Sequence, residues 1–382
     1  MKKEAILVTG STGFVGGVLA AALAASDERP ILLPIRQKHA PEDARDAIAA
    51  ELLAMGRDAD AATLRRLVFI PLPRTAVLLE RLVPELVPAL ADYEITDVVH
   101  CAGSLSYFNA AKLREGNFAL TQAFLDVARA VGVKRFVYVS TAFASGYVDG
   151  TIAERLHSEP ERDPNEYTRS KRETEALVAA SGLPFLIVRP SIVVGHSASG
   201  SYQGRPYGAY QIWTGLSKFL CDHYRQVIHA VAPDIPLNFI HQDALQAGFL
   251  GAFYATEPSS IVHLVSRDQV TTRDYWQLWM DLCGKPEQVV YHDTLEALDR
   301  SALDEGQRLL IDFAEANIEI STHRWQFETT ALDRMRAMGL PFVDASRQTL
   351  TACLERFLSA SPKSLAFMAR LAARGAADSI AL

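Results

Sequence analysis

Hydrophobic positions in the first half of the chain alternate between short apolar runs and longer stretches with helical spacing. The apolar runs lie at residues 5–9, 30–35, 68–72, 95–100, 135–140 and 185–189. Between the later runs, residues 117–131 and 166–180 repeat apolar positions every three to four residues, as helices do. Strands alternating with helices predict βαβ units and a parallel sheet covered on both faces. The expected fold class is therefore α/β, a doubly wound sheet that binds its ligand at the carboxyl ends of the strands.

The second half of the chain has a different pattern. Residues 195–215 are rich in Gly, Ser and Tyr and predict a long loop, which in compact proteins is usually functional or disordered. Helical spacing then returns in four stretches, at residues 276–283, 295–313, 330–339 and 347–358. We expect a core over residues 1–195 and a mainly helical cap over 196–382, with segments around 237–270 returning to the core.

A glycine-rich turn, TGSTGFVG at residues 9–16, joins the first predicted strand to the first helix. Gly10 permits a tight turn, Gly13 lets the backbone approach a pyrophosphate, and Gly16 lets helix and strand pack closely. The helix N-terminus adds N–H groups that bind phosphate. The turn predicts a dinucleotide site in a Rossmann core. Its other expected cofactor contacts are Thr12, Phe14 and Val15.

The end of the second strand indicates which dinucleotide is bound. An NAD-specific site places a carboxylate there for the ribose 2′-hydroxyl, about 20 residues past the turn. This chain instead has Arg36 and Lys38, and the first carboxylate is Glu42. A guanidinium suits a 2′-phosphate, so we expect NADP(H) in preference to NAD(H).

Tyr167 and Lys171 are four residues apart at the start of a predicted helix, which puts them on one face. A free phenol titrates near pH ~10, and a neighbouring ammonium is expected to lower that pKa. Tyr167 can then exchange protons as a general acid or base. Ser140 and Thr141 follow the fifth strand, where a parallel sheet presents catalytic groups, so a hydroxyl there can orient the substrate oxygen.

Taken together, these segments resemble the extended short-chain dehydrogenase/reductase superfamily. The resembling segments are TGSTGFVG (9–16), HCAG (100–103), NFALT (117–121), VYVSTAFASG (137–146), YTRSK (167–171) and VRPSIVVG (188–195). The resemblance implies that Tyr167 donates the proton, that Lys171 binds the nicotinamide ribose and tunes Tyr167, and that Thr141 is the hydroxyl partner. It also implies cofactor contacts by Ala102, Asn117, Pro190 and Ile192.

Within that superfamily the chain is most similar to the thioester reductase and fatty acyl-CoA reductase group, which includes the terminal domain of carboxylic acid reductases. The pointers are ILLPIRQ (31–37), STAFASGYVDG (140–150), SIVVGHSASG (191–200), LNFIHQDAL (237–245) and IVHLVSRD (261–268). One departure concerns adenine recognition. The group usually has Gly-Asp after the third strand, whereas this chain has Pro73 and Arg74.

The resemblance implies an NADPH-dependent reductase of an acyl thioester, either CoA-bound or carrier-bound, that forms an aldehyde or an alcohol. A carbonyl reductase or hydroxy-dehydrogenase acting on a hydrophobic small molecule is the main alternative, and a nucleotide-sugar epimerase is a third. A cofactor-sensing regulator on the same fold is disfavoured by the Tyr/Lys pair. We expect residues 195–224 to form a wall of the substrate pocket. The expected substrate contacts are Phe143, Tyr202, Tyr207, Tyr210 and Trp213.

Composition excludes several other classes of protein. Hydrophobic residues make up 49% and charged residues 22%, and the net charge of −7 includes no basic block of the kind that binds nucleic acid. The four cysteines lack metal-ligand or disulfide spacing, so neither a metal site nor a disulfide is expected. Without a signal sequence or a long apolar stretch, a cytoplasmic protein is expected. The resemblance leaves the oligomeric state open, with a homodimer as one form.

Overall fold

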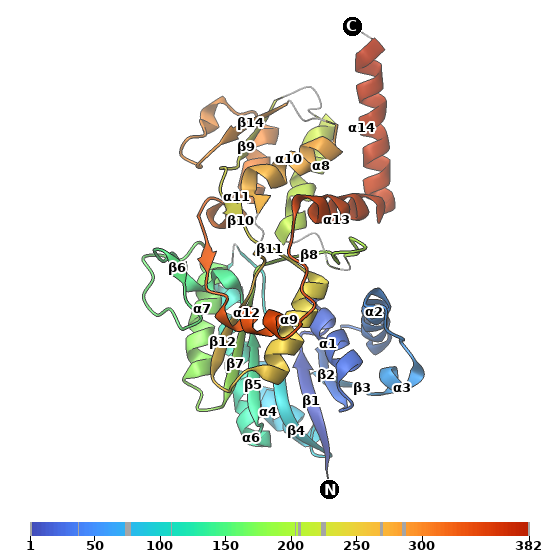
Figure 1. Ribbon diagram of the computed structural model, residues 1–382, viewed down its shortest axis with the longest axis vertical. Helices are drawn as coiled ribbons and strands as arrows, with labels where there is room; N and C mark the ends of the chain where they lie inside the picture. Colours follow the sequence, from blue (N-terminus) through green and yellow to red (C-terminus); the bar gives the residue numbers. More distant parts are fainter. Residues whose placement is uncertain are drawn as a thin grey trace. The chain divides into compact units, whose positions relative to one another are not determined.

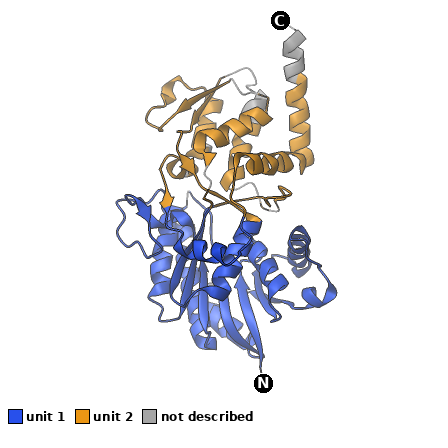
Figure 2. Ribbon diagram, in the orientation of Figure 1, with its two compact units in different colours: residues 1–191, 243–265, 327–342 blue, residues 192–242, 266–326, 343–382 orange. Residues whose placement is uncertain are grey.

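The computed structural model describes residues 2–36, 38–72, 78–107, 109–202, 204, 208–222, 227–267, 270–284 and 288–380. The chain divides into two compact units that interleave along the sequence (Figure 2). Unit 1 comprises residues 1–191, 243–265 and 327–342, and unit 2 comprises residues 192–242, 266–326 and 343–382.

Unit 1 is built on a seven-stranded sheet of order β12-β7-β5-β4-β1-β2-β3, in which all neighbours pair in parallel (Figure 1). The central strand β1 is fully buried from Ala5 onward, as expected for an apolar strand covered on both faces. The doubly wound α/β fold is thereby confirmed. The strands are β1 (Lys3–Thr9), β2 (Ile31–Arg36), β3 (Leu67–Leu72), β4 (Tyr93–His100), β5 (Arg135–Val139), β7 (Phe185–Pro190) and β12 (Ser260–Leu264).

Helices flank this sheet, as the right-handed crossovers require. Helix α1 has buried residues from Gly16 to Ala24, because its Gly and Ala side chains let it lie close to the sheet. The helices are α1 (Phe14–Ser26), α2 (Pro41–Ala54), α3 (Ala61–Arg65), α4 (Leu78–Ala89), α5 (Ala110–Leu113), α6 (Leu120–Val131), α7 (Glu166–Ala179), α9 (Gln242–Ala255) and α12 (Thr330–Ala337). Two further strands are short, β6 (Thr151–Ile152) and β15 (Gln326–Phe327).

Unit 2 combines helices with three pairs of short strands. The helices are α8 (Gln211–Asp222), α10 (Thr272–Leu282), α11 (Glu305–Ser321), α13 (Arg347–Ser359) and α14 (Pro362–Ile380). Strands β8 (Ile192–Val194) and β11 (Phe239–His241) pair in parallel, as do β9 (Ile228–Val231) and β14 (Val289–His292). Strands β10 (Pro236–Leu237) and β13 (Val270–Thr271) pair antiparallel.

Two expectations about unit 2 are wrong. The predicted loop over residues 195–215 ends early, because α8 begins at Gln211 and continues through Gly215. Buried Trp213 and Leu216 on this helix show that packing outweighs the low helix propensity of glycine. The predicted helix over 295–313 begins only at Glu305, since the Asp304 carboxylate accepts a hydrogen bond from the N–H of Gln307 and caps the helix there.

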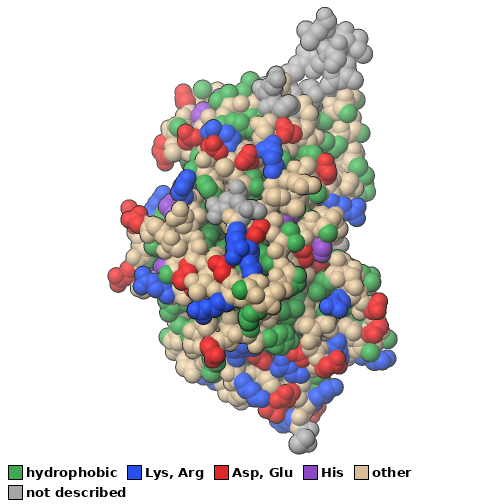
Figure 3. All heavy atoms as spheres, viewed as in Figure 1, with side chains coloured by type: hydrophobic (Ala, Val, Ile, Leu, Met, Phe, Trp, Pro, Cys, Tyr) green, Lys and Arg blue, Asp and Glu red, His purple; other side chains and the backbone are tan. Residues whose placement is uncertain are grey.

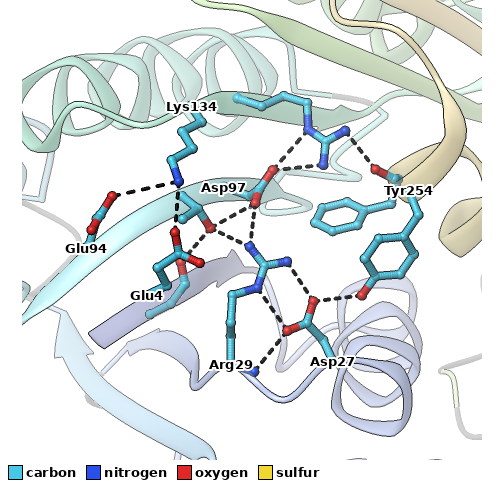
Figure 4. A network of polar contacts seen from close by, with 11 residues as sticks. Glu4, Asp27, Arg29, Glu94, Asp97, Lys134 and Tyr254 are labelled. Carbon is cyan, nitrogen blue, oxygen red and sulfur yellow. Dashed lines mark hydrogen bonds and ion pairs between the residues drawn. The ribbon is translucent and has the colours of Figure 1, made fainter. Parts of the chain in front are cut away.

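A network of ion pairs connects the elements near the amino ends of β2 and β5 (Figure 4). Asp97 lies between two guanidinium groups, with its oxygens 3.0 Å from Arg29 Nη1 and 2.8 Å from Arg135 Nη2. Arg29 also pairs with Asp27, which accepts a hydrogen bond from the Tyr254 hydroxyl at 2.8 Å. The network therefore ties α9 to the sheet at the edge opposite the strand carboxyl ends.

Candidate active site

The glycine turn follows β1 at the carboxyl edge of the sheet. Gly10 has φ +74°, and a Cβ there would lie 2.6 Å from the backbone nitrogen of Ala102. A Cβ on Gly16 would lie 2.2 Å from the carbonyl oxygen of Gly10, so neither position has room for a side chain. Gly13 precedes α1 and provides no side-chain cap. A helix N-terminus of this kind is suited to phosphate.

The end of β4 is fastened to the glycine turn through Thr9 and His100. The Thr9 hydroxyl accepts a hydrogen bond from the N–H of Ala102 at 3.2 Å and lies 2.9 Å from Nδ1 of His100. His100 Nε2 lies 3.0 Å from the hydroxyl of Thr121 on α6. Burial, helped by the nearby Lys171 ammonium, lowers the pKa of His100 to about 3. His100 is therefore a neutral bridge between the turn and α6.

Asn117 lies in a π-helical turn, Arg114–Ala119, between α5 and α6. Such turns occur mostly at functional sites. The Asn117 side chain accepts a hydrogen bond from the N–H of Ser104 at 2.7 Å and donates to the Ser170 hydroxyl at 2.8 Å. Ser170 in turn donates to the carbonyl oxygen of Tyr167 at 2.7 Å. Asn117 thus connects the loop after β4 to helix α7.

Helix α7 begins at a capping box, in which the Asn165 side chain accepts a hydrogen bond from the N–H of Thr168. One turn later, Lys171 Nζ donates a hydrogen bond to the carbonyl oxygen of Val139, the last residue of β5, at 2.9 Å. The ammonium also lies 4.8 Å from the centre of the Tyr138 ring. Burial lowers the pKa of Lys171 to about 8. These contacts fix the lysine at the end of β5.

The pKa of Tyr167 is raised in this structure, whereas the sequence predicted that it would be lowered. Burial, followed by the neighbouring Tyr107 phenol, raises the pKa of Tyr167 well above its ordinary value. The expectation that Lys171 lowers this pKa is wrong for this structure, because the phenol is desolvated and its burial makes the largest contribution to the pKa. Tyr167 is therefore held protonated, the state that a proton donor requires.

Thr141 comes two residues after the end of β5 and is 8% exposed. It precedes the short 3-10 helix Ala142–Ser145 and makes no side-chain cap bond to it. The Lys171 contact to Val139 brings the ammonium next to this segment. Phe143, an expected substrate contact, is buried with its ring 6.0 Å from that of Phe327 in the core of unit 1.

Three serine hydroxyls at the carboxyl ends of strands are buried and have no hydrogen-bond partner among the residues that the structure describes. Ser11 follows β1, Ser140 follows β5 and Ser191 follows β7. An unsatisfied buried hydroxyl costs roughly 1–3 kcal/mol, so these atoms favour a polar ligand along this edge. Together with the glycine turn, they fit a dinucleotide. Pro190, another expected cofactor contact, ends β7, and Ile192 begins β8 in unit 2.

The end of β2 presents basic side chains. Arg36 is its last residue, and both Arg36 and Lys38 are exposed. Gln37 lies outside the described residues, as do residues 73–77 after β3, where adenine recognition was expected to differ.

A comparison with protein families matches residues 8–243 to the NAD-binding family described as male sterility protein. The matched segment is more than half of the chain. The chain belongs to this family. Its predicted resemblance to the extended short-chain dehydrogenase/reductases is confirmed, and with it the type of enzyme, an NAD(P)-dependent oxidoreductase.

Among curated proteins, the chain is similar to a Drosophila melanogaster protein named as a putative fatty acyl-CoA reductase, CG8303. The two are 26% identical over an alignment of 218 residues, and the match covers 48% of this chain. The match spans only 40% of the length of that relative.

Solved structures support the fold. The terminal R domain of the myxalamid PKS-NRPS pathway matches with a TM-score of 0.70 and 19% identity, over 94% of this chain and 91% of that one. An archaeal thiolation-reductase di-domain of a non-ribosomal peptide synthetase has a TM-score of 0.65 and 19% identity, over 93% and 75%. A Thermus thermophilus UDP-glucose 4-epimerase in complex with NAD has a TM-score of 0.60 and 17% identity, over 94% and 100%.

Three of the expected substrate contacts lie in the aromatic core of unit 2. Tyr210 is fully buried, with its ring centre 4.2 Å from that of Tyr202. Trp213 is 6% exposed and stacks on Trp279 with ring centres 5.8 Å apart. Tyr207 lies outside the described residues. The structure thus gives Tyr210 and Trp213 a packing role within their unit.

Sequence reasoning missed several residues that build the site. His100 lies in the motif HCAG and Ser170 in the motif YTRSK. Both are polar side chains that can form hydrogen bonds, and this property could have marked them as site residues from the sequence alone. Tyr107 carried no such signal, since it lies outside every motif, yet its ring packs against Tyr167.

Among the described residues, none of the helices combines the length and the apolar character that a membrane-crossing helix needs. In the same part of the chain, no group of three or more His, Cys, Asp or Glu side chains is arranged to hold a metal ion. Figure 3 shows acidic and basic side chains interspersed over the face it draws, in keeping with the net charge of −7.

Proposed function

We propose that the chain reduces an acyl thioester, carried by CoA or by a carrier protein, to an aldehyde with NADPH. The observation that carries the proposal is the arrangement at the end of β5. There a protonated Tyr167 lies one helical turn before Lys171, and Lys171 is hydrogen-bonded to Val139, the last residue of β5. Thr141 lies two residues after Val139 in the chain. The named fatty acyl-CoA reductase and the two reductase-domain structures support the thioester as substrate.

The residues of the site divide the chemistry among them. A bound nicotinamide supplies the hydride that adds to the thioester carbonyl carbon. The Thr141 hydroxyl and the Tyr167 phenol donate hydrogen bonds to the carbonyl oxygen and stabilise its developing charge. Tyr167 then transfers its proton to that oxygen, which gives a hemithioacetal. Cleavage of its C–S bond releases the aldehyde and the free thiol.

The cofactor would be held along the carboxyl edge of the sheet. Lys171 would bind the nicotinamide ribose, while Arg36 and Lys38 would bind the 2′-phosphate that distinguishes NADPH. The expected contacts at the turn and along the strand ends are Gly10, Thr12, Gly13, Phe14, Val15, Gly16, Ala102, Asn117, Pro190 and Ile192. Residues 195–224 would form a wall of the acyl pocket.

The test is NADPH oxidation by the purified chain with three substrate panels: acyl-CoA thioesters, free aldehydes and hydrophobic ketones. We expect oxidation with acyl-CoA, accompanied by release of free CoA in equal amount. The ratio of NADPH consumed to CoA released then distinguishes an aldehyde product from an alcohol. Oxidation with ketones alone would instead identify a carbonyl reductase. An epimerase would consume no NADPH in net terms.

A further inference from the structure

A second tyrosine, Tyr107, packs against Tyr167. The two ring centres are 5.3 Å apart and the ring planes are inclined at 63°, an edge-to-face arrangement. Aromatic rings prefer this geometry, because the positive edge of one meets the negative face of the other. The chemistry proposed above assigns no role to Tyr107.

The segments that carry the two tyrosines are connected through one side chain, that of Asn117. Asn117 bonds both backbone groups of Ser104, three residues before Tyr107. It also bonds the Ser170 hydroxyl, which donates to the Tyr167 carbonyl oxygen. A Cβ on Gly116 would lie 2.7 Å from the Ser104 Cβ, so the loop is packed tightly against this turn. The contact between the two rings is therefore built into the fold of unit 1.

Both phenols lie in an environment that disfavours charge. Burial raises the pKa of Tyr107 to about 12 and raises that of Tyr167 further. Both rings nevertheless keep part of their surface exposed, so a substrate can reach them. Among the described residues, Tyr138 on β5 interacts electrostatically with Tyr167. Lys171, one helical turn after Tyr167, interacts in turn with His100 and Cys101 at the end of β4 and with Glu175 on α7.

We propose that Tyr107 is a positioning residue of the active site, whose ring orients the Tyr167 phenol and shields it from water. The effect of Tyr107 on turnover rests on the proposed reductase function, whereas its effect on the Tyr167 phenol does not. The ring, and not the hydroxyl, carries this role, because the observed contact is between rings.

The matched variants are Tyr107→Ala, which removes the ring, and Tyr107→Phe, which removes only the hydroxyl. With acyl-CoA and NADPH, Tyr107→Ala should lower kcat roughly tenfold or more, since small displacements of a catalytic group are costly. The KM for NADPH should stay unchanged. Tyr107→Phe should resemble the wild type within about twofold. Equal damage in both variants, or none in either, would overturn the proposal.

A second measurement needs no substrate and therefore separates this inference from the proposed function. The pH titration of ring-¹³C-labelled tyrosine, with Tyr167→Phe used to assign the signal, reports the ionisation of Tyr167 directly. Tyr107→Ala should bring that ionisation to lower pH. Tyr107→Phe should lower it much less, because it removes only the contribution of the Tyr107 hydroxyl and keeps Tyr167 shielded from water. If Tyr107→Ala unfolds, Tyr107→Val removes less volume but still leaves room for water beside Tyr167, and should show a smaller shift in the same direction. An unchanged Tyr167 titration in the folded variants would refute the positioning role, whatever the substrate proves to be.

Discussion

At the scale of single residues, Tyr167 carries the proton transfer, so its hydroxyl is the most informative atom to remove. Tyr167→Phe keeps the ring and its contact with Tyr107 but cannot donate a proton. General acid catalysis is typically worth ~10²–10⁴-fold, so kcat should fall by about that factor. NADPH affinity, measured by fluorescence titration, should stay nearly unchanged. A variant that retained turnover within a few-fold of wild type would refute the assignment.

Arg36 tests the choice of cofactor, since it is exposed at the end of β2 where an NAD-specific site has a carboxylate. Arg36→Ala should weaken NADPH roughly tenfold to a hundredfold, from the ~1.5–3 kcal/mol of a charge-assisted contact. NADH is the internal control, because it lacks the 2′-phosphate, and its affinity should hardly change. Equal weakening of both cofactors would leave Arg36 with a structural role only.

At the scale of elements, the glycine turn and α1 offer two neighbouring glycines with different surroundings. A Cβ at position 16 would lie 2.2 Å from the Gly10 carbonyl oxygen, whereas one at position 17 would lie 3.2 Å from that of Ser11. Overpacking costs ~1–3 kcal/mol, so Gly16→Ala, by displacing the turn, should raise the Kd for NADPH at least about fivefold. Gly17→Ala should stay within about twofold. Comparable effects of the two substitutions would mean that helix packing does not position the turn.

The elements also show what the sequence could and could not predict. The six strands of the first half and the Tyr167/Lys171 helix followed from periodicity, because buried parallel strands and amphipathic helices carry strong patterns. The π-helical turn around Asn117 could not be predicted from the spacing of hydrophobic residues, since only tertiary hydrogen bonds distinguish it from a normal helix start. Helix α8 was missed because its glycine suggested a loop while its apolar side chains pack in a core.

Helix α8 leads to a prediction that separates packing from substrate contact. Trp213 stacks on Trp279 and contacts the Phe367 ring edge-to-face at 4.9 Å. Trp213→Ala should destabilise unit 2 by ~3–5 kcal/mol, as measured by urea denaturation. Leu309→Ala is the control, because that side chain of unit 2 is 62% exposed and its loss should cost ~0.5 kcal/mol or less. A stable Trp213→Ala variant with an altered KM for acyl substrate would favour the pocket-wall proposal instead.

At the scale of the whole molecule, the two units differ in their sensitivity to acid. Two buried histidines of unit 1, His100 and His263, each have a pKa lowered to about 3, first by burial and then by nearby cations. Asp27 adds to the acid sensitivity of unit 1. Burial alone would raise its pKa, but the hydrogen bonds that it accepts from Arg29 and Tyr254 outweigh burial and lower the pKa to about 2. In unit 2, His229 also has a pKa lowered by burial, but its side chain is only half-buried, so its effect is smaller.

These pKa values fix the direction and range of the expected pH dependence. The folded histidines stay neutral while the unfolded chain binds protons below pH 6.5, so the stability they provide is present above pH 6.5 and is lost as the pH falls toward 3. Each should contribute a slope of about 1.4 kcal/mol per pH unit within that range. Glu51 of unit 1 opposes one of these slopes between pH 7 and 4.5, because burial raises its pKa from 4.5 to about 7 and the folded chain then takes up its proton first. The stability that Asp27 provides is lost only as the pH falls from 3.8 to about 2.

The four tryptophans make the difference between units measurable, because Trp213, Trp276, Trp279 and Trp325 all belong to unit 2. In urea, tryptophan fluorescence follows unit 2, whereas far-UV circular dichroism follows both units. Between pH 7.5 and pH 4.5 the dichroism midpoint should fall further than the fluorescence midpoint. His263→Gln should remove most of the dichroism slope, because Glu51 offsets the proton taken up by one histidine and the substitution removes the other. A fluorescence midpoint that falls as far as the dichroism midpoint, or a His263→Gln variant with an unchanged slope, would show that these two histidines do not govern acid stability.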